Sequence, residues 1–236
     1  MRFPSLVRAT FLARPNRFRA EIMVKGVRAA AHVASPGRMT ELLLPGRTVW
    51  VTPAAAPHRV TDYDLKLVEH DGVLVSVDSR LPNALFAEAL AAGRILADSG
   101  YTTVESEVVL GGSRLDFCLS GASGICWVEC KSVNLVEDGL ALFPDAPTVR
   151  GRKHLLELIA AVGAGQRALA AFIIQRDDVA AFAPHAEADP DFAAALHEAQ
   201  HHGVDIIAWT CRVNLHEIVL DRQVPLCLGA MPKGET

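Results

Sequence analysis

The sequence has few aromatic residues and no long apolar run. Aromatic residues make up 6% of the 236 residues, and no apolar stretch approaches the roughly 20 residues that a membrane-spanning helix requires. The first 20 residues place Arg and Pro every few positions and lack the apolar core of a signal peptide. We therefore expect a protein of the cytoplasm without a membrane segment.

The cysteines lack the pattern of a disulfide framework or of a zinc site. The five cysteines are odd in number and form no CxxC pair, which is typical of reduced thiols in a cytosolic protein. A zinc half-site at Cys126 and Cys130 is disfavoured, because strand alternation points both side chains into the packed face. The Gly-x-Ser-x-Gly, P-loop and GxGxxG motifs are absent as well, which argues against an α/β-hydrolase, a P-loop NTPase and a dinucleotide-binding enzyme.

Charge is distributed unevenly along the chain. The net charge is −4, yet residues 1–61 contain ten Lys or Arg and only two acids, Glu21 and Glu41. Half of the residues are hydrophobic, so the chain is globular. A basic first quarter joined to an acidic remainder predicts two domains, the first of which suits a polyanion. A solvated Arg-rich surface is the alternative.

Residues 1–80 have the pattern of a small β-barrel. Apolar-rich runs separated by turn signals predict six strands, at 6–12, 18–25, 27–33, 47–52, 64–69 and 73–77. Residues 35–46 predict one short helix, with Ser35 as its cap and Pro36 in its first turn. A barrel with a helix between its third and fourth strands is the plan of an OB-fold, a frequent nucleic-acid-binding module.

Residues 81–236 change to alternating helices and strands. We expect helices at 83–99, 152–162 and 190–202, strands at 103–110, 114–119, 125–133, 169–174 and 204–209, and a polar loop at 134–150. This order predicts a mixed sheet with helices on both faces. The fold class is therefore a two-domain α+β or α/β protein, with an OB-like barrel followed by a mixed sheet.

Two adjacent strands of the second domain carry charge inside apolar runs. Glu129 and Lys131 share one face of a strand, and a hairpin through residues 121–124 brings Asp116 to that face. Two carboxylates with the Cys130 carbonyl suit Mg²⁺ or Mn²⁺, and Lys131 beside them suits hydrolysis of a phosphodiester. The alternative is a solvated Glu129–Lys131 pair, which the apolar residues 125–128 disfavour.

Two further acids are candidates for completing this metal site. Glu88 lies on the first helix of the second domain, and Glu107 lies on the strand before Asp116. Each is equally compatible with a simple surface position. His197 and His201, spaced by four residues on one helix, lack an evident third ligand, so a polar helix face is the better interpretation.

Basic residues in two regions are candidates for contacts with a nucleic-acid backbone. A helix that begins near residue 150 offers backbone N–H groups to phosphate, and cations there oppose the helix dipole unless they serve a ligand. A solvated helix end is the alternative. The candidate nucleic-acid-binding residues are Arg14, Arg17, Arg19 and Arg38 in the first domain and Arg150, Arg152, Lys153 and His154 in the second.

Six strings in order give the chain a specific resemblance to the sugar fermentation stimulation protein A (SfsA) family over nearly its whole length. They are FLARPNRF at 11–18, HVASPGRMTELL at 32–43, SRLDF at 113–117, VECKSV at 128–133, FPDAPT at 143–148 and RGRKHL at 150–155. The resemblance implies an N-terminal OB-like domain and a C-terminal PD-(D/E)xK nuclease-like domain, with Asp116, Glu129 and Lys131 at the metal-binding and catalytic positions. Cys130 stands where the family commonly has Val.

The sequence therefore supports two principal hypotheses. The first is a Mg²⁺-dependent nuclease that binds DNA or RNA, with DNA favoured, and cuts it in the second domain. In this hypothesis the protein binds the nucleic acid mostly through contacts with its backbone. The second is a non-catalytic DNA-binding regulator of sugar, notably maltose, metabolism on a nuclease scaffold, a role that only the resemblance implies. An interaction module without nucleic acid is a third possibility. The sequence leaves the oligomeric state open.

Overall fold

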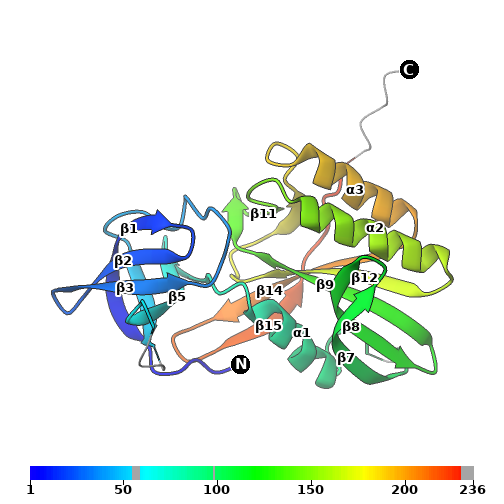
Figure 1. Cartoon of the computed structure of the whole chain (residues 1–236), viewed down its shortest axis with the longest axis horizontal. Helices are drawn as coiled ribbons and strands as arrows, with labels where there is room; N and C mark the ends of the chain where they lie inside the picture. The colour runs from blue at the N-terminus through cyan, green and yellow to red at the C-terminus, as the bar shows by residue number, and fades with distance from the viewer. Residues whose placement is uncertain (55–58, 98, 230–236) are drawn as a thin grey trace.

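The computed structural model describes residues 1–54, 59–97 and 99–229. These residues form a β-barrel, drawn in blue and cyan in Figure 1, beside a larger sheet with helices on both of its faces. Among the described residues, no helix is both long enough and apolar enough to cross a membrane.

The first domain is the small β-barrel that the sequence predicts. Its strands are paired in the order β3-β2-β1-β4-β5-β6, and a parallel pairing of β3 with β5 closes the barrel. Alternate residues of each strand point inward, as Ala20, Ile22 and Val24 do on β2. The bounds are β1 Val7–Asn16, β2 Arg19–Val24, β3 Val27–Val33, β4 Thr48–Pro53, β5 Tyr63–His70 and β6 Val73–Ser76.

The helix expected at residues 35–46 is absent from the structure, which has turns there. Ser35 caps no helix, and its hydroxyl accepts a hydrogen bond from the Gly37 amide at 3.3 Å. The Arg14 guanidinium instead donates hydrogen bonds to the carbonyls of Ser35, Gly37 and Arg38, which would be needed as acceptors in a first helical turn. Only one i to i−4 bond forms, from the Leu43 amide to the Met39 carbonyl.

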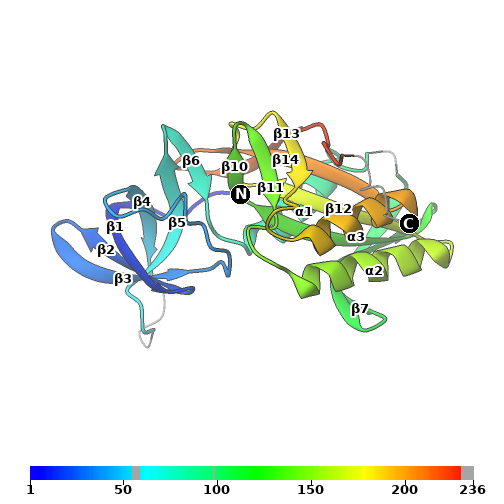
Figure 2. The same ribbon diagram turned by 90° about the horizontal axis from the view of Figure 1, so that it is seen from above.

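The second domain is built on a six-stranded mixed sheet, as predicted. Its order is β15-β14-β12-β9-β8-β7, and β12 runs parallel to both β9 and β14. Helices α2 and α3 cover one face, while α1 packs on the other (Figures 1 and 2). The bounds are α1 Leu81–Ala91, β7 Tyr101–Leu110, β8 Ser113–Gly121, β9 Gly124–Val133, α2 Val149–Gly163, β12 Arg167–Ile174, α3 Pro190–His201, β14 Asp205–Val213 and β15 Ile218–Gln223.

Helix α1 is shorter than the expected helix at 83–99. It ends at Ala91, and the chain then turns through Gly93 and Leu96, whose φ angles are +64° and +52°. The Arg94 side chain donates a hydrogen bond to the Leu220 carbonyl at 2.7 Å, and Ile95 is buried. The Ala and Leu content of this segment favours a longer helix, but α1 ends early, and contacts with the distant strand β15 accompany this early end.

Four strands are absent from the sequence prediction. Strands β10 Leu135–Glu137 and β11 Leu140–Phe143 lie in the segment expected to be a polar loop, and they form a small sheet with β13 Ala181–Pro184. Strand β15 extends the main sheet. Strands of three or four residues have too little local pattern to be recognised, and β11 pairs with a partner 41 residues away, Leu140 with Ala181.

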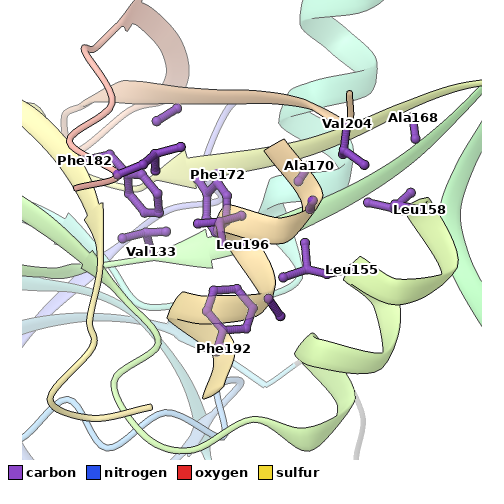
Figure 3. Packing of buried hydrophobic residues seen from close by; sticks show 14 of the residues in the cluster. Val133, Leu155, Leu158, Ala168, Ala170, Phe172, Phe182, Phe192, Leu196 and Val204 are labelled. Atoms are coloured by element: carbon purple, nitrogen blue, oxygen red, sulfur yellow. The ribbon is translucent and has the colours of Figure 1, made fainter. Parts of the chain in front are cut away.

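The main core lies between the sheet and helices α2 and α3. Leu155 and Leu158 of α2 and Leu196 of α3 face the sheet (Figure 3). The rings of Phe172 and Phe182 pack with their centroids 4.2 Å apart. Alternate residues of β12 enter the core on the α1 side, so this strand is buried on both faces and reads as a continuous apolar run.

The two domains are joined by buried polar contacts as well as by the chain. Gln175 is fully buried, and its amide oxygen accepts a hydrogen bond from the Ser76 hydroxyl at 2.7 Å. Its amide nitrogen donates to the Ser132 hydroxyl and to the Asp78 carbonyl. The strand end that follows the Glu129–Lys131 segment is thus tied to the end of the barrel.

Candidate active site

The hairpin of β8 and β9 brings Asp116 beside Glu129, as the sequence predicts. The strands are joined by the turn between the paired residues Gly121 and Gly124, and their register runs to the pair Phe117–Val128. One residue further, the Asp116 carboxylate accepts a hydrogen bond from the Cys130 amide at 2.7 Å. The Asp116 side chain thereby accepts a hydrogen bond next to the last paired residues of the two strands, where the strands separate and a hollow opens.

Glu129 lies at the centre of a buried polar group. It is 5% exposed, and its Oε1 accepts a hydrogen bond from Lys131 Nζ at 2.7 Å and contacts Nδ1 of His154 on α2. Within the described chain, the other oxygen, Oε2, is buried and has no hydrogen-bond partner. A buried carboxylate oxygen without a partner is costly, so this atom needs a bound cation or water to satisfy it.

The two carboxylates have pKa values shifted in opposite directions. Burial and the neighbouring charge of Glu129 raise the pKa of Asp116, although the Cys130 amide and Asn83 oppose that rise. Burial also acts to raise the pKa of Glu129, but hydrogen bonds from His154 and Lys131 outweigh it and hold that pKa below its usual value. The charge of Lys131 also opposes the rise at Asp116 but does not outweigh burial and Glu129, whereas Glu129 has two donors in direct contact.

These residues line a cleft of about 540 Å³ between the two domains. The barrel contributes the loop at residues 35–37, and the second domain contributes the hairpin, α1 and the start of α2. Across the cleft, the Arg38 amide donates a hydrogen bond to Asp145 at 2.5 Å. The position and open shape of the cleft suit an elongated polar ligand that touches both domains.

The two further acids occupy different places. Glu107 lines the cleft with Asp116, pairs with Arg114 at 2.8 Å and has a φ of +58°. Such a backbone angle is uncommon for a residue other than glycine. Glu88 does not line the cleft; it accepts a hydrogen bond from the Met1 ammonium at 2.9 Å. The structure therefore brings Glu107, and not Glu88, to the site.

Among the four candidate arginines of the barrel, Arg14 has a structural position. Its guanidinium is directed at backbone carbonyls of Arg17 and of residues 35–38, and burial lowers its pKa. Within the described residues, no hydrogen bond or ion pair engages the side chains of Arg17, Arg19 and Arg38. These three guanidinium groups remain available for a ligand.

The basic residues at the start of α2 are also divided. Arg150 lines the cleft. Arg152 pairs with Asp191 of α3, and Lys153 donates a hydrogen bond to the Gly112 carbonyl. His154, predicted as a nucleic-acid contact, is 3% exposed and faces Glu129 and Arg150. Its buried place makes it a positioning residue for Glu129, not a surface contact.

Asn83 is a site residue absent from the sequence prediction. Its side-chain amide donates a hydrogen bond to Asp116 Oδ1 at 2.6 Å. Near it, Asp78 is 1% exposed and pairs with Lys66 at 2.8 Å and Arg80 at 2.6 Å. Asn83 lies two residues inside a helix start, where polar residues are common, so its sequence position carries no distinctive signal.

The remaining polar candidates lie elsewhere. Cys126 and Cys130 both belong to the apolar core on the α1 side of the sheet, as alternation predicts. His197 and His201 lie on α3. In the described part of the chain, no three His, Cys, Asp or Glu side chains come together as a set of metal ligands. A cation in the cleft would therefore need a backbone carbonyl, water or substrate oxygens beside Asp116 and Glu129.

Comparison with known proteins agrees with this architecture. Residues 12–77 match the family described as “SfsA N-terminal OB domain”, and residues 80–217 match “Sugar fermentation stimulation protein RE domain”. A sugar fermentation stimulation protein homolog of Moorella thermoacetica is 50% identical over 212 residues, which is 89% of this chain and 91% of the relative. One from Desulforamulus reducens is 45% identical over 225 residues, 95% of this chain and 94% of the relative.

A solved structure also matches nearly the whole chain. It is described as Pyrococcus furiosus SfsA in complex with Ca²⁺ and has a TM-score of 0.89 at 32% identity. The match covers 96% of this chain and 97% of that one, so both domains are included. The chain therefore belongs to the sugar fermentation stimulation protein (SfsA) family.

Proposed function

We propose that this protein is a divalent-metal-dependent phosphodiesterase that hydrolyses nucleic acid, DNA in the first place, in the cleft between its domains. The observation that carries the proposal is the buried Oε2 of Glu129, which has no hydrogen-bond partner among the residues that the structure describes, with Asp116 and Lys131 beside it. Two carboxylates and a lysine on adjacent strands form the residue set of a PD-(D/E)xK nuclease. The four buried free thiols suit the reducing cytoplasm, where we expect the protein to act.

The residues at the site fit Mg²⁺ or Mn²⁺. Asp116, Glu129 and the Cys130 carbonyl would hold the ion, with Glu107 at the rim as a further oxygen donor. The raised pKa of Asp116 and the orphaned Glu129 oxygen are both relieved by a nearby positive charge. The Pyrococcus furiosus relative is described with Ca²⁺, which also takes oxygen ligands. Such an ion supplies charge neutralisation at the phosphate and acidifies a water molecule.

The chain's own residues hold the reacting groups in place. The Cys130 amide and Asn83 orient the Asp116 carboxylate, while His154 orients Glu129. Lys131 Nζ, 2.7 Å from Glu129, would position the attacking water and offset negative charge on the phosphate. Each of these groups is buried or partly buried, so its orientation is set before substrate arrives.

The division of labour follows the two domains. We assign nucleic-acid binding to residues 1–80 and chemistry to residues 81–236. Arg17, Arg19 and Arg38 would contact the phosphate backbone, and Arg150 would contact it inside the cleft. Backbone contacts of this kind carry no sequence information directly, so binding should depend steeply on salt concentration.

The test is a cleavage assay on single- and double-stranded DNA and RNA with Mg²⁺, Mn²⁺ or EDTA. Asp116→Ala and Lys131→Ala should each lower the cleavage rate at least about a hundredfold, because Asp116 would hold the metal ion and Lys131 would offset negative charge on the phosphate. The matched control is Glu198→Gln, an exposed acid of α3 outside the cleft.

Binding is measured beside cleavage in EDTA. Binding retained by both variants, with cleavage lost in both and in EDTA, supports the nuclease. Binding by the wild-type protein with no cleavage of any substrate under any metal would overturn it. That outcome would favour the non-catalytic DNA-binding regulator of sugar, notably maltose, metabolism.

A further inference from the structure

Phe18 is an exposed aromatic residue held in a fixed position at the turn between β1 and β2. Its side chain is 49% exposed, and its ring stacks on His32 of β3 with centroids 6.5 Å apart and planes 24° apart. Its amide donates a hydrogen bond to the Asn16 side chain at 3.0 Å, and its carbonyl accepts one from the Val33 amide at 3.0 Å. The turn is therefore ordered on both sides of the ring.

Cations surround this aromatic pair. Arg17 and Arg19 flank Phe18 in sequence, and Arg19 is the cross-strand partner of His32, so these two side chains share the outer face of the barrel. Three acids lie near the pair. Asp64 is the register partner of His32 on β5, and its charge is paired with Arg59 at 2.7 Å. Glu21 and Asp62 line a neighbouring hollow with Arg19, and Asp62 already accepts a hydrogen bond from the Ala30 amide. The Arg17 side of the pair is therefore its more positive side.

Hydrogen bonds from one side chain, that of Arg14, link the aromatic pair to the active-site cleft. The Arg14 guanidinium donates to the carbonyl of Arg17 at 2.7 Å, of Gly37 at 2.7 Å and of Ser35 at 3.1 Å. Ser35 and Gly37 line the cleft that holds Asp116 and Glu129. The turn that carries Phe18 is thus fixed to the loop that lines the cleft.

We propose that Phe18 and His32 form a stacking platform for one unpaired base, and that the substrate is therefore a single-stranded nucleic acid. Aromatic rings beside cations bind single strands by stacking on base faces while the cations hold the backbone. Inside a duplex the neighbouring pairs cover these faces. The inference rests on the proposed function, because it names the substrate class of the same cleft.

The experiment measures equilibrium binding in EDTA, where no cleavage takes place. The probes are a fluorescent twelve-nucleotide dT strand and a twelve-base-pair blunt duplex. Phe18→Ala should weaken binding of the single strand by about five- to a hundredfold and leave duplex binding unchanged. Phe18→Trp should restore it, because tryptophan also presents a flat ring. Val27→Ala, which truncates an exposed side chain at the other end of the β2–β3 ribbon, is the matched control.

The outcomes separate this inference from the nuclease proposal. Equal binding of the single strand by Phe18→Ala and wild type, or an equal loss on strand and duplex, would overturn the platform. A thermal melt shows whether Phe18→Ala is folded; if it is not, Phe18→Leu, which keeps the apolar bulk but has no flat ring, repeats the test with the same expected loss on the single strand. Stacking-dependent binding by a wild type that never cleaves would leave the platform standing and overturn the nuclease.

Discussion

The charged residues that we assign to binding on the barrel and those that we assign to chemistry in the second domain are held in opposite ways. On the barrel, Arg17 is exposed, and no partner engages its guanidinium within the described residues. In the second domain, Glu129 and His154 are almost fully buried and bonded to each other. An unpaired surface cation is ready to contact phosphate, whereas a buried network fixes geometry. Binding and chemistry should therefore respond to different mutations.

The largest expected effect concerns the buried charges where the domains meet. Asp78→Asn should lower the free energy of unfolding by about 3 kcal/mol, because it leaves Lys66 beside a neutral partner in a buried place. Hydrogen bonds from Arg80 and Lys66 outweigh burial and lower the pKa of Asp78. Its stabilising contribution is thus complete above the unfolded-state pKa of about 4 and is lost as the pH falls through the lower folded-state pKa.

Urea unfolding of Asp78→Asn at pH 7 and in steps down to pH 3 measures this contribution. The difference from wild type should be greatest at pH 7 and shrink in acid. Asp177→Asn, the same change at an exposed site, should have little effect at either pH. A difference that stays constant from pH 7 to pH 3 would show that the charge of Asp78 is not the source of the stability.

The second-largest effect is expected at His154, a buried residue of the site itself. His154→Gln should lower kcat about ten- to a hundredfold, because the orientation of Glu129 is loosened. KM for nucleic acid should not change, since His154 is too buried to touch the strand. Steady-state cleavage with varied substrate and varied Mg²⁺ separates the two quantities.

The same change at His201, an exposed residue on α3, is the control and should alter neither kcat nor KM. A His154→Gln protein that binds nucleic acid more weakly, with kcat intact, would return His154 to the role of a substrate contact. The contrast between buried positioning groups and surface contacts would then fail at this residue.

The smallest effect concerns the exposed cations. Arg17→Glu and Arg19→Glu should each weaken binding about tenfold at low salt and reduce the slope of log affinity against log salt by about one. Stability should hardly change, because surface charges contribute little to it. Anisotropy titrations over a range of salt concentrations measure both quantities.

Lys25→Glu makes the same charge change at the other end of the β2–β3 ribbon. It should weaken binding less than the changes at Arg17 and Arg19, and the salt slope should stay close to that of wild type. Equal losses for all three variants would mean that the barrel attracts nucleic acid only by its net charge, without a defined path.

The elements that were predicted correctly have strong local patterns. The strands of the barrel, the β8–β9 hairpin, α2, α3 and β12 all show clear periodicity in their apolar residues, and short turns punctuate them. The helix expected at 35–46 was wrong, because its carbonyls bond to Arg14, more than 20 residues earlier in the chain. Local propensity carries no information about such a distant donor.

The site residues also divide into those that the local sequence predicts and those that it does not. Asp116, Glu129 and Lys131 could be placed together because strand alternation and one tight turn determine which side chains share a face. Asn83 and the buried position of His154 could not, because their contacts join helices α1 and α2 to the hairpin across 33 and 25 residues of the chain. Glu88 lies on α1 as expected but outside the cleft.

The sequence by itself determined the family, the order of the two domains and the pair of charged strands, since each of these depends on residues close together in the chain. Only the tertiary structure decided which cations donate hydrogen bonds to backbone carbonyls and which, among the described residues, have no partner. It also decided which oxygen of Glu129 has no hydrogen-bond partner in that part of the chain. Those outcomes depend on which distant groups meet in the folded chain, and a hydrogen bond taken by one group is no longer open to another.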